Sequence, residues 1–95
     1  MTNCNKQNEQ MGDLAVLQKA RQDLIGELDA IIQYDEHLAS ASNAIAQATW
    51  EDIRNEELVH VGELLGLIYY LAPYQKQYVE QGIKEFTARV QKALG

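Results

Sequence analysis

The stretch "SASN", residues 40–43, is the only cluster of small polar residues in the middle of this 95-residue chain. Such clusters favour turns, and Asn is a frequent cap of a following helix. On both sides of it, apolar residues recur at helical spacing, from Leu14 to about Ala41 and from Asn43 to about Leu71. The sequence therefore predicts an antiparallel hairpin of two helices, each about 40 Å long.

The rest of the chain continues this helical pattern. Residues 1–12 are polar and are predicted to form a flexible tail. Pro73 ends the second helix and opens a third, over about residues 74–93, which Gly82 can interrupt. No run of residues alternates at strand spacing. We expect one all-α domain over residues 13–95.

Composition excludes several classes of protein. Apolar residues make up 46 % of the chain, which indicates a folded protein. A net charge of −6 argues against nucleic acid or an anionic membrane as partner, because both attract basic surfaces. No apolar run is long enough to predict a transmembrane helix. The single cysteine, Cys4, forms no internal disulfide, so a cytoplasmic location is expected.

A glutamate interrupts the apolar face of each long helix. On a wheel of about 100° per residue, Glu57 lies at the centre of a stripe, and His60 lies about 60° away. The apolar residues of that stripe are Ala46, Trp50, Ile53, Leu64, Ile68 and Leu71. Glu27 is central in a stripe formed by Val16, Ala20, Leu24, Ile31, Tyr34 and Leu38. A buried, unpaired carboxylate costs several kcal/mol, so both glutamates need partners.

The two glutamates also match in height. Each lies about 15 residues from the turn, which places Glu27 opposite Glu57, with His60 one turn beyond. A metal ion removes the cost of burying them, since carboxylates and imidazole are natural ligands. Di-iron bundles take a Glu from each of two helices and a Glu-x-x-His from each of the other two. One chain supplies half of that set, so we expect two copies to form a ferritin-like four-helix bundle with a shared di-iron site.

The sequence around these residues resembles that of a known family. "ELDAIIQYDEHL", residues 27–38, and "DIRNEELVHVGEL", residues 52–64, are similar to the encapsulated-ferritin family of half-ferritins. The resemblance covers about residues 20–73. The residues that carry it, at their mutual spacing, are Glu27, Tyr34, Glu57 and His60.

The resemblance implies a function, a cofactor and partners. Hairpins of this family pair across an interface that holds two irons, and the dimers associate into rings, typically of ten subunits. The family oxidises Fe(II) with dioxygen for iron storage inside an encapsulin shell, a cytoplasmic nanocompartment. Carried over to this chain, Glu27, Glu57 and His60 would be iron ligands in the catalytic centre, and Tyr34 would lie beside it.

Two features differ from the family pattern. Members carried as separate cargo end in a short apolar docking peptide, whereas residues 90–95 are "VQKALG". A truncated chain, a domain of a shell fusion and a relative outside any shell all fit this ending. The family often has acidic residues beside the ligand of the first helix, on the path of incoming metal. Here Gly26 precedes Glu27, although Asp29 could serve.

Other polar and aromatic residues have plainer interpretations. His37 lies about 80° from Glu27 and is predicted to be a surface or interface histidine rather than a ligand. Glu63 is predicted to be solvated, with a role on the metal path or beside a ligand as the alternative. Four tyrosines are predicted to pack against the third helix or a neighbouring dimer: Tyr69, Tyr70, Tyr74 and Tyr78.

Two other classes of function are alternatives: a different di-iron enzyme and a non-enzymatic protein. A rubrerythrin-type peroxidase uses an additional four-cysteine iron centre, which the single Cys4 cannot build, and a di-iron hydroxylase needs an apolar substrate channel for which a short hairpin has little room. The non-enzymatic alternative is a helical dimer in which Glu27, Glu57 and His60 form a buried polar network or bind structural zinc.

Overall fold

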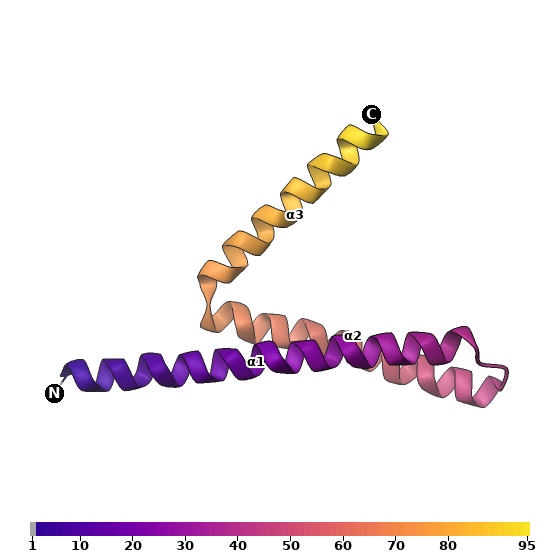
Figure 1. Cartoon of the computed structure of the whole chain (residues 1–95), viewed down its shortest axis with the longest axis horizontal. Coiled ribbons are helices and arrows are strands. Elements are labelled where there is room, and N and C mark those ends of the chain that lie inside the picture. Colours follow the sequence, from indigo (N-terminus) through magenta and orange to yellow (C-terminus); the bar gives the residue numbers. More distant parts are fainter. Residues whose placement is uncertain (1) are drawn as a thin grey trace.

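The computed structural model describes the backbone of residues 2–95 and the side chains of residues 13–95. It consists of three helices, α1 (Thr2–Ala39), α2 (Ala44–Leu71) and α3 (Pro73–Leu94), with no strand in the described chain. Helices α1 and α2 pack against each other as an antiparallel hairpin, and α3 rises away from it at the end opposite the turn (Figure 1). The predicted all-α class and hairpin are confirmed.

Local chemistry explains the turn between α1 and α2. The side-chain oxygen of Asn43 accepts hydrogen bonds from the backbone N–H groups of Ile45 and Ala46, each at 3.0 Å. These bonds satisfy two of the donors that the first turn of a helix leaves free. The predicted cap and the predicted turn at residues 40–43 are therefore both confirmed.

A second change of direction separates α2 from α3. Helix α2 ends at Leu71, and the Ala72 N–H donates to the carbonyl of Ile68 at 2.8 Å. Pro73 is the first residue of α3, where its missing N–H removes no helical hydrogen bond. We call the segment from Leu71 to Gln75 the corner. It confirms the predicted end of the second helix.

Two predicted boundaries differ from the structure. Helix α3 continues without a break through Gly82, because one glycine costs a helix only about 1 kcal/mol. Helix α1 starts at Thr2, earlier than the predicted start near residue 13. The flexible tail predicted for residues 1–12 falls on residues whose side chains lie outside the described part of the chain, so that expectation stays a prediction.

The buried core is small and lies beside the corner. Leu17 and Ala20 of α1 pack there against Ile68 and Ala72, with Leu24, Tyr69 and Leu71 partly buried around them. Val16, which the wheel placed in the apolar stripe, is instead 44 % exposed, whereas Leu17 is only 5 % exposed. The face of α1 that packs against α2 is therefore rotated from Glu27 toward Leu17 and Leu24.

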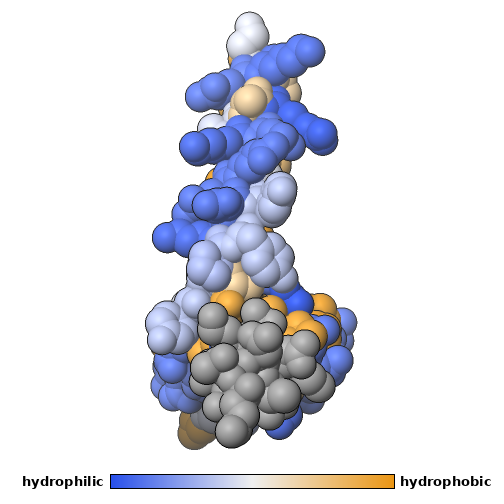
Figure 2. Space-filling model, turned by 90° about the vertical axis from the view of Figure 1, so that its left-hand side faces the viewer, coloured by the Kyte–Doolittle hydropathy of each residue, from blue (hydrophilic) through white to orange (hydrophobic). Residues whose placement is uncertain are grey.

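The hairpin is a single layer with two uncovered faces. The chain measures only 14 Å along its shortest axis, little more than the diameter of one helix. Seen from the corner end, α3 presents a mostly hydrophilic surface, and apolar residues gather where it meets the hairpin (Figure 2). Each face of the hairpin is therefore open to a partner.

Within the described residues, no helix is both long and apolar enough to cross a membrane.

Candidate metal site

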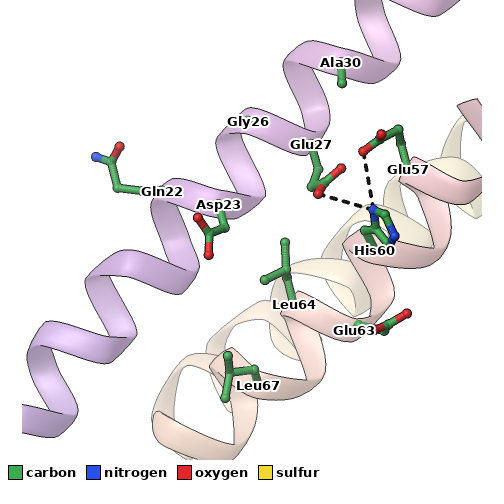
Figure 3. A pocket seen from close by; sticks show the side chains of 10 residues that line it. All are labelled: Gln22, Asp23, Gly26, Glu27, Ala30, Glu57, His60, Glu63, Leu64 and Leu67. Carbon is green, nitrogen blue, oxygen red and sulfur yellow. Dashed lines mark ion pairs between the residues drawn. The ribbon is translucent and has the colours of Figure 1, made fainter. Parts of the chain in front are cut away.

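Three potential metal ligands converge between α1 and α2. Helix α1 provides Glu27, and α2 provides Glu57 and His60 one turn later (Figure 3). The His60 Nδ1 atom lies 3.4 Å from Glu27 Oε1 and 3.5 Å from Glu57 Oε2. One ligand atom from each of the three residues lies within 4.8 Å of the other two. The predicted meeting of these side chains across the hairpin is confirmed.

The hairpin fixes this arrangement through its turn and a nearby ion pair. Glu57 and His60 are three residues apart, so they share one side of α2. Arg54, one turn before Glu57, places its Nη1 atom 2.9 Å from Asp35 Oδ1 on α1. Because this contact joins the two helices between the turn and the site, it helps to hold Glu27 and Glu57 at one level.

The two carboxylates are largely removed from water. The side chains of Glu27 and Glu57 are 22 % and 20 % exposed, and that of His60 is 48 % exposed. Glu27 Oε2 is buried and has no hydrogen-bond partner in the described structure. A buried carboxylate oxygen without a donor is costly. A cation bound by this group would remove that cost, so the donor set fits a metal ion.

The three residues line an open groove of about 730 Å³ on one face of the hairpin, which we call the site groove. Its walls are formed by Gln22, Asp23, Gly26, Glu27, Ala30, Glu57, His60, Glu63, Leu64 and Leu67. Asp23 lies one turn before Glu27 on the wall formed by α1 (Figure 3). The groove therefore has acidic residues beside the three central side chains.

The ligand set of one chain is incomplete. Among the described residues, the group contains Glu27, Glu57 and His60 and no fourth acidic, histidine or cysteine side chain. Protein metal sites of mixed oxygen and nitrogen ligands use four to six positions. Water or a second chain has to supply the others, and the open groove leaves room for either.

The other predicted site residues lie elsewhere. The Tyr34 ring packs edge-on against His37, with ring centroids 6.0 Å apart, and Tyr34 does not line the site groove. His37 also packs against Trp50 of α2, with ring centroids 4.9 Å apart, and is partly buried between the two helices. This position agrees with the predicted interface histidine, and His37 is not one of the three converging side chains. The rings shield one another because Trp50 lies opposite His37 near the turn. Asp29 is exposed and does not line the groove.

Glu63 and Gly26, by contrast, do line the groove. Glu63 is exposed, as predicted, and its carboxylate points away from α1 (Figure 3). Gly26 precedes Glu27 on the opposite wall, and a Cβ atom built on it would meet nothing within 4 Å. The position beside Glu27 could therefore hold a larger residue without a clash in the single chain.

Sequence reasoning missed the polar contacts that join distant segments. Arg54 and Asp35 are one such pair. Arg21 forms another set, donating from Nη2 to Gln75 Oε1 at 2.7 Å and to the Tyr74 hydroxyl at 3.0 Å. Helical periodicity carries no signal for these contacts. The opposite charges of Arg54 and Asp35, at similar distances from the turn, are the one feature that could have suggested that pair.

Comparison with known proteins identified no relative. Searches of the chain against protein families, curated proteins and solved structures each found no match. The case for a metal site therefore rests on the convergence of Glu27, Glu57 and His60, on the buried oxygen of Glu27 and on the open groove. The family resemblance rests on the spacing of those residues in the sequence.

Proposed function

We propose that this chain is half of a ferroxidase that binds Fe(II) through Glu27, Glu57 and His60 and oxidises it with dioxygen. The observation that carries the proposal is the convergence of two carboxylates and an imidazole from two helices, with one ligand atom of each within 4.8 Å of the others. Carboxylate and imidazole are the ligand set of di-iron helical bundles. The resemblance to encapsulated ferritins, which rests on the spacing of the same residues in the sequence, favours the same chemistry.

A second copy completes the site in this proposal. Two hairpins that pack with their site grooves together form a four-helix bundle with four glutamates and two histidines. This is the ligand set of two iron ions in a bundle of this type. The pairing also covers Leu64 and Leu67, apolar residues that line the groove. The dimer therefore gains both metal ligands and apolar burial.

The residues act mainly through charge. Four carboxylates balance the four positive charges of two Fe(II) ions, and they stabilise the additional charge of two Fe(III) ions. Each iron gives up one electron. Dioxygen accepts two electrons and two protons and leaves as hydrogen peroxide. The acidic side chain of Asp23 on the groove wall attracts iron, which is the substrate of the reaction.

Iron storage is the physiological role that this activity serves in the proposal. By resemblance, the dimers associate into a ring inside an encapsulin shell in the cytoplasm, and the shell retains the ferric product. Co-expression of the chain with an encapsulin shell protein, followed by isolation of intact shells, tests this partnership. Recovery of the chain only outside the shells contradicts it.

The central test compares two adjacent glutamates. Fe(II) is added to the protein in air, and ferric absorbance in the near ultraviolet is followed by stopped flow. We expect Glu57→Ala to lower the oxidation rate by at least about a hundredfold, since loss of one ligand disrupts the bridging set. Glu56→Ala removes the same charge from an exposed neighbouring position and should keep the parent rate.

Two outcomes contradict the ferroxidase proposal. One is oxidation by the parent no faster than in buffer. The other is equal activity of Glu57→Ala and Glu56→Ala, with helical content matched by circular dichroism. Anaerobic titration gives a further measure, because the shared site predicts one Fe(II) per chain and binding that promotes association of two chains.

A specific contact favours a second candidate, a non-enzymatic polar network. His60 Nδ1 lies at nearly equal distances from Glu27 and Glu57, so a protonated imidazole could pair with both carboxylates. Such a network, or structural zinc at the same residues, could fix the pairing of two hairpins. Dimers that persist in chelator and oxidise no iron, but dissociate when His60 is changed to Ala, support this candidate over the ferroxidase.

A further inference from the structure

Helix α3 leaves the hairpin on the side opposite the site groove. Around α1, the groove residues Asp23 and Ala30 lie about 40° and 60° from Glu27 in one direction, whereas Arg21 and Leu28 lie about 120° and 100° away in the other. Arg21 is the residue of α1 that hydrogen-bonds to α3, through Gln75 and Tyr74. A partner bound at the site groove therefore leaves α3 free.

A row of exposed apolar residues lies on the side of the hairpin from which α3 leaves. Ile25, Leu28 and Ile32 follow Arg21 at helical spacing, and all three are about half exposed. Leu58 of α2 is equally exposed and lies one turn after Arg54, the residue paired with Asp35 on this side. We call Ile25, Leu28, Ile32 and Leu58 the apolar hairpin face. No described segment of the same chain covers it.

Helix α3 carries a matching unpartnered surface. Val79, Ile83, Phe86 and Val90 repeat at intervals of four, three and four residues and form one line, which we call the α3 stripe. Ile83 and Phe86 are 58 % and 65 % exposed. On the wheel the stripe lies within about 80° of Gln75, whose side chain meets Arg21. The stripe is therefore on the side of α3 that meets α1 at the corner. Figure 1 shows an open angle between α3 and the hairpin.

The corner keeps these two surfaces of one chain apart. Arg21 donates three hydrogen bonds to the first turn of α3, two to Gln75 Oε1 and one to the Tyr74 hydroxyl. Ala72 is buried, and Pro73 limits the backbone at the bend. Folding α3 down onto its own hairpin would break these contacts. A surface from another chain can enter the angle without breaking them.

Charge favours a second copy as that partner. Residues 73–94 of α3 carry four basic and two acidic side chains, a net charge of +2. The hairpin over residues 13–72 carries three basic and eleven acidic side chains, a net charge of −8. The helix of one copy is therefore attracted to the hairpin of another, and the apolar residues of both surfaces become buried on contact.

We propose that two copies of this chain interlock, so that the α3 stripe of each lies on the apolar hairpin face of the other. This interface is separate from the groove and needs no metal. It goes beyond the proposed ferroxidase, whose pairing uses the opposite side of the hairpin. Each chain then has two different surfaces for other copies.

Cross-linking between differently labelled chains tests the geometry. Cys4 is first replaced by Ser, which leaves the chain without cysteine. Leu28→Cys in one tagged chain and Phe86→Cys in a second chain are then mixed in chelator and joined with a short bis-maleimide. We expect the mixed cross-linked dimer to predominate, because residue 28 of one copy lies near residue 86 of the other.

Other cross-linking patterns overturn the interlocked arrangement. Cross-links only between two copies of residue 86 indicate that α3 pairs with α3. The double variant Leu28→Cys/Phe86→Cys distinguishes closure within one chain, since closure gives an internal link at monomer mass under dilution. Gln33→Cys in place of Leu28→Cys is the control. If the yield of cross-linked dimer with Leu28→Cys is no higher than with this control, the apolar hairpin face is not in contact with α3 of another copy.

Sedimentation of the metal-free protein provides the second test. We expect the parent to dimerise, and Phe86→Glu to weaken the dimer at least about thirtyfold, as truncation of a central interface residue does. Ala88→Glu adds the same charge about 160° away around α3 and should leave the dimer intact. A monomeric metal-free parent, or equal effects of both substitutions, overturns the proposal. Phe86→Glu keeps Glu27, Glu57 and His60, so a failure here is distinguishable from a failure of the ferroxidase.

Discussion

The two faces of the hairpin are both incomplete, in opposite ways. On one face, Glu27, Glu57 and His60 place charge where the helical pattern calls for apolar residues. On the other, the apolar hairpin face places Leu28 and its neighbours where a single chain leaves them in water. A buried charge needs an opposite charge, whereas an exposed apolar surface needs only cover.

The two faces therefore require different kinds of partner. The site groove is specific, because a cation or a hydrogen-bond donor must meet Glu27 Oε2. The apolar hairpin face is less demanding about chemistry and depends on shape and contact area. Metal should therefore control pairing at the first face and leave pairing at the second unchanged.

The largest effect, on Fe(II) affinity, is expected when the three converging polar side chains are replaced by apolar ones. Replacing Glu27, Glu57 and His60 together by Leu should reduce Fe(II) affinity by at least about a thousandfold. The same change should stabilise the metal-free protein by about 1–4 kcal/mol, because buried charges are costlier than well-packed apolar residues. Anaerobic equilibrium dialysis and urea unfolding measure the two quantities. Retained iron binding would place the site elsewhere.

Metal should stabilise the chain through one face only. Anaerobic Fe(II) at about 100 times its dissociation constant should stabilise the parent by about 2.7 kcal/mol. We expect the same stabilisation of Phe86→Glu and none of Glu57→Ala, as measured by thermal unfolding. If Fe(II) does not stabilise Phe86→Glu, the two faces are coupled, and metal does not act through the groove alone.

Loss of the hydrogen bonds at the corner should weaken dimerisation through the apolar hairpin face more than it weakens iron binding in the site groove. Arg21→Ala removes the hydrogen bonds that orient α3, at an expected cost of about 1–2 kcal/mol to the metal-free dimer. Iron affinity should stay at the parent value. Gln18 accepts a hydrogen bond from Arg21 and, among the described residues, its side chain contacts no residue of α3 through a hydrogen bond, so Gln18→Ala is the matched control. Sedimentation equilibrium and iron titration report both quantities, and a loss of iron affinity in Arg21→Ala contradicts the separation.

The smallest effect concerns the turn, which serves both faces. Asn43→Ala removes the cap of α2 and should destabilise the protein by about 1 kcal/mol, and Asn43→Ser should recover most of that loss. Urea unfolding at fixed protein concentration measures it. Because both faces depend on the hairpin, metal binding and metal-free dimerisation should decline together. A change in only one of them would show that the turn acts on that face directly.

Local signals in the sequence predicted much of the fold. Asn43 marked the start of α2 and Pro73 its end, because capping and the missing proline N–H act within a few residues. The equal distances of Glu27 and Glu57 from the turn were enough to bring them together once the hairpin formed. Their spacing predicted the meeting of the side chains, and metal binding by them stays a prediction.

Long-range packing could not be predicted in the same way. The wheel placed Val16 in the packed stripe because it took Glu27 as the centre of that stripe. In the structure, the centre of the contact between α1 and α2 is rotated away from Glu27, so that Leu17 is buried and Val16 is exposed. His37 was expected at the surface or at an interface, and the sequence did not indicate that its partner would be Trp50 of the other helix. The direction of α3 depends on hydrogen bonds between Arg21 and Gln75, which are 54 positions apart and leave no periodic trace.

Because α3 leaves the hairpin on the side away from the groove, the number of chains in an assembly is restricted. With both proposed interfaces filled, each chain meets one neighbour through its groove and a different neighbour through α3, and the two kinds of contact alternate. A closed assembly built this way contains an even number of chains, and an odd-numbered ring is impossible. If each groove pair holds two irons, as proposed, the assembly should bind as many irons as it has chains.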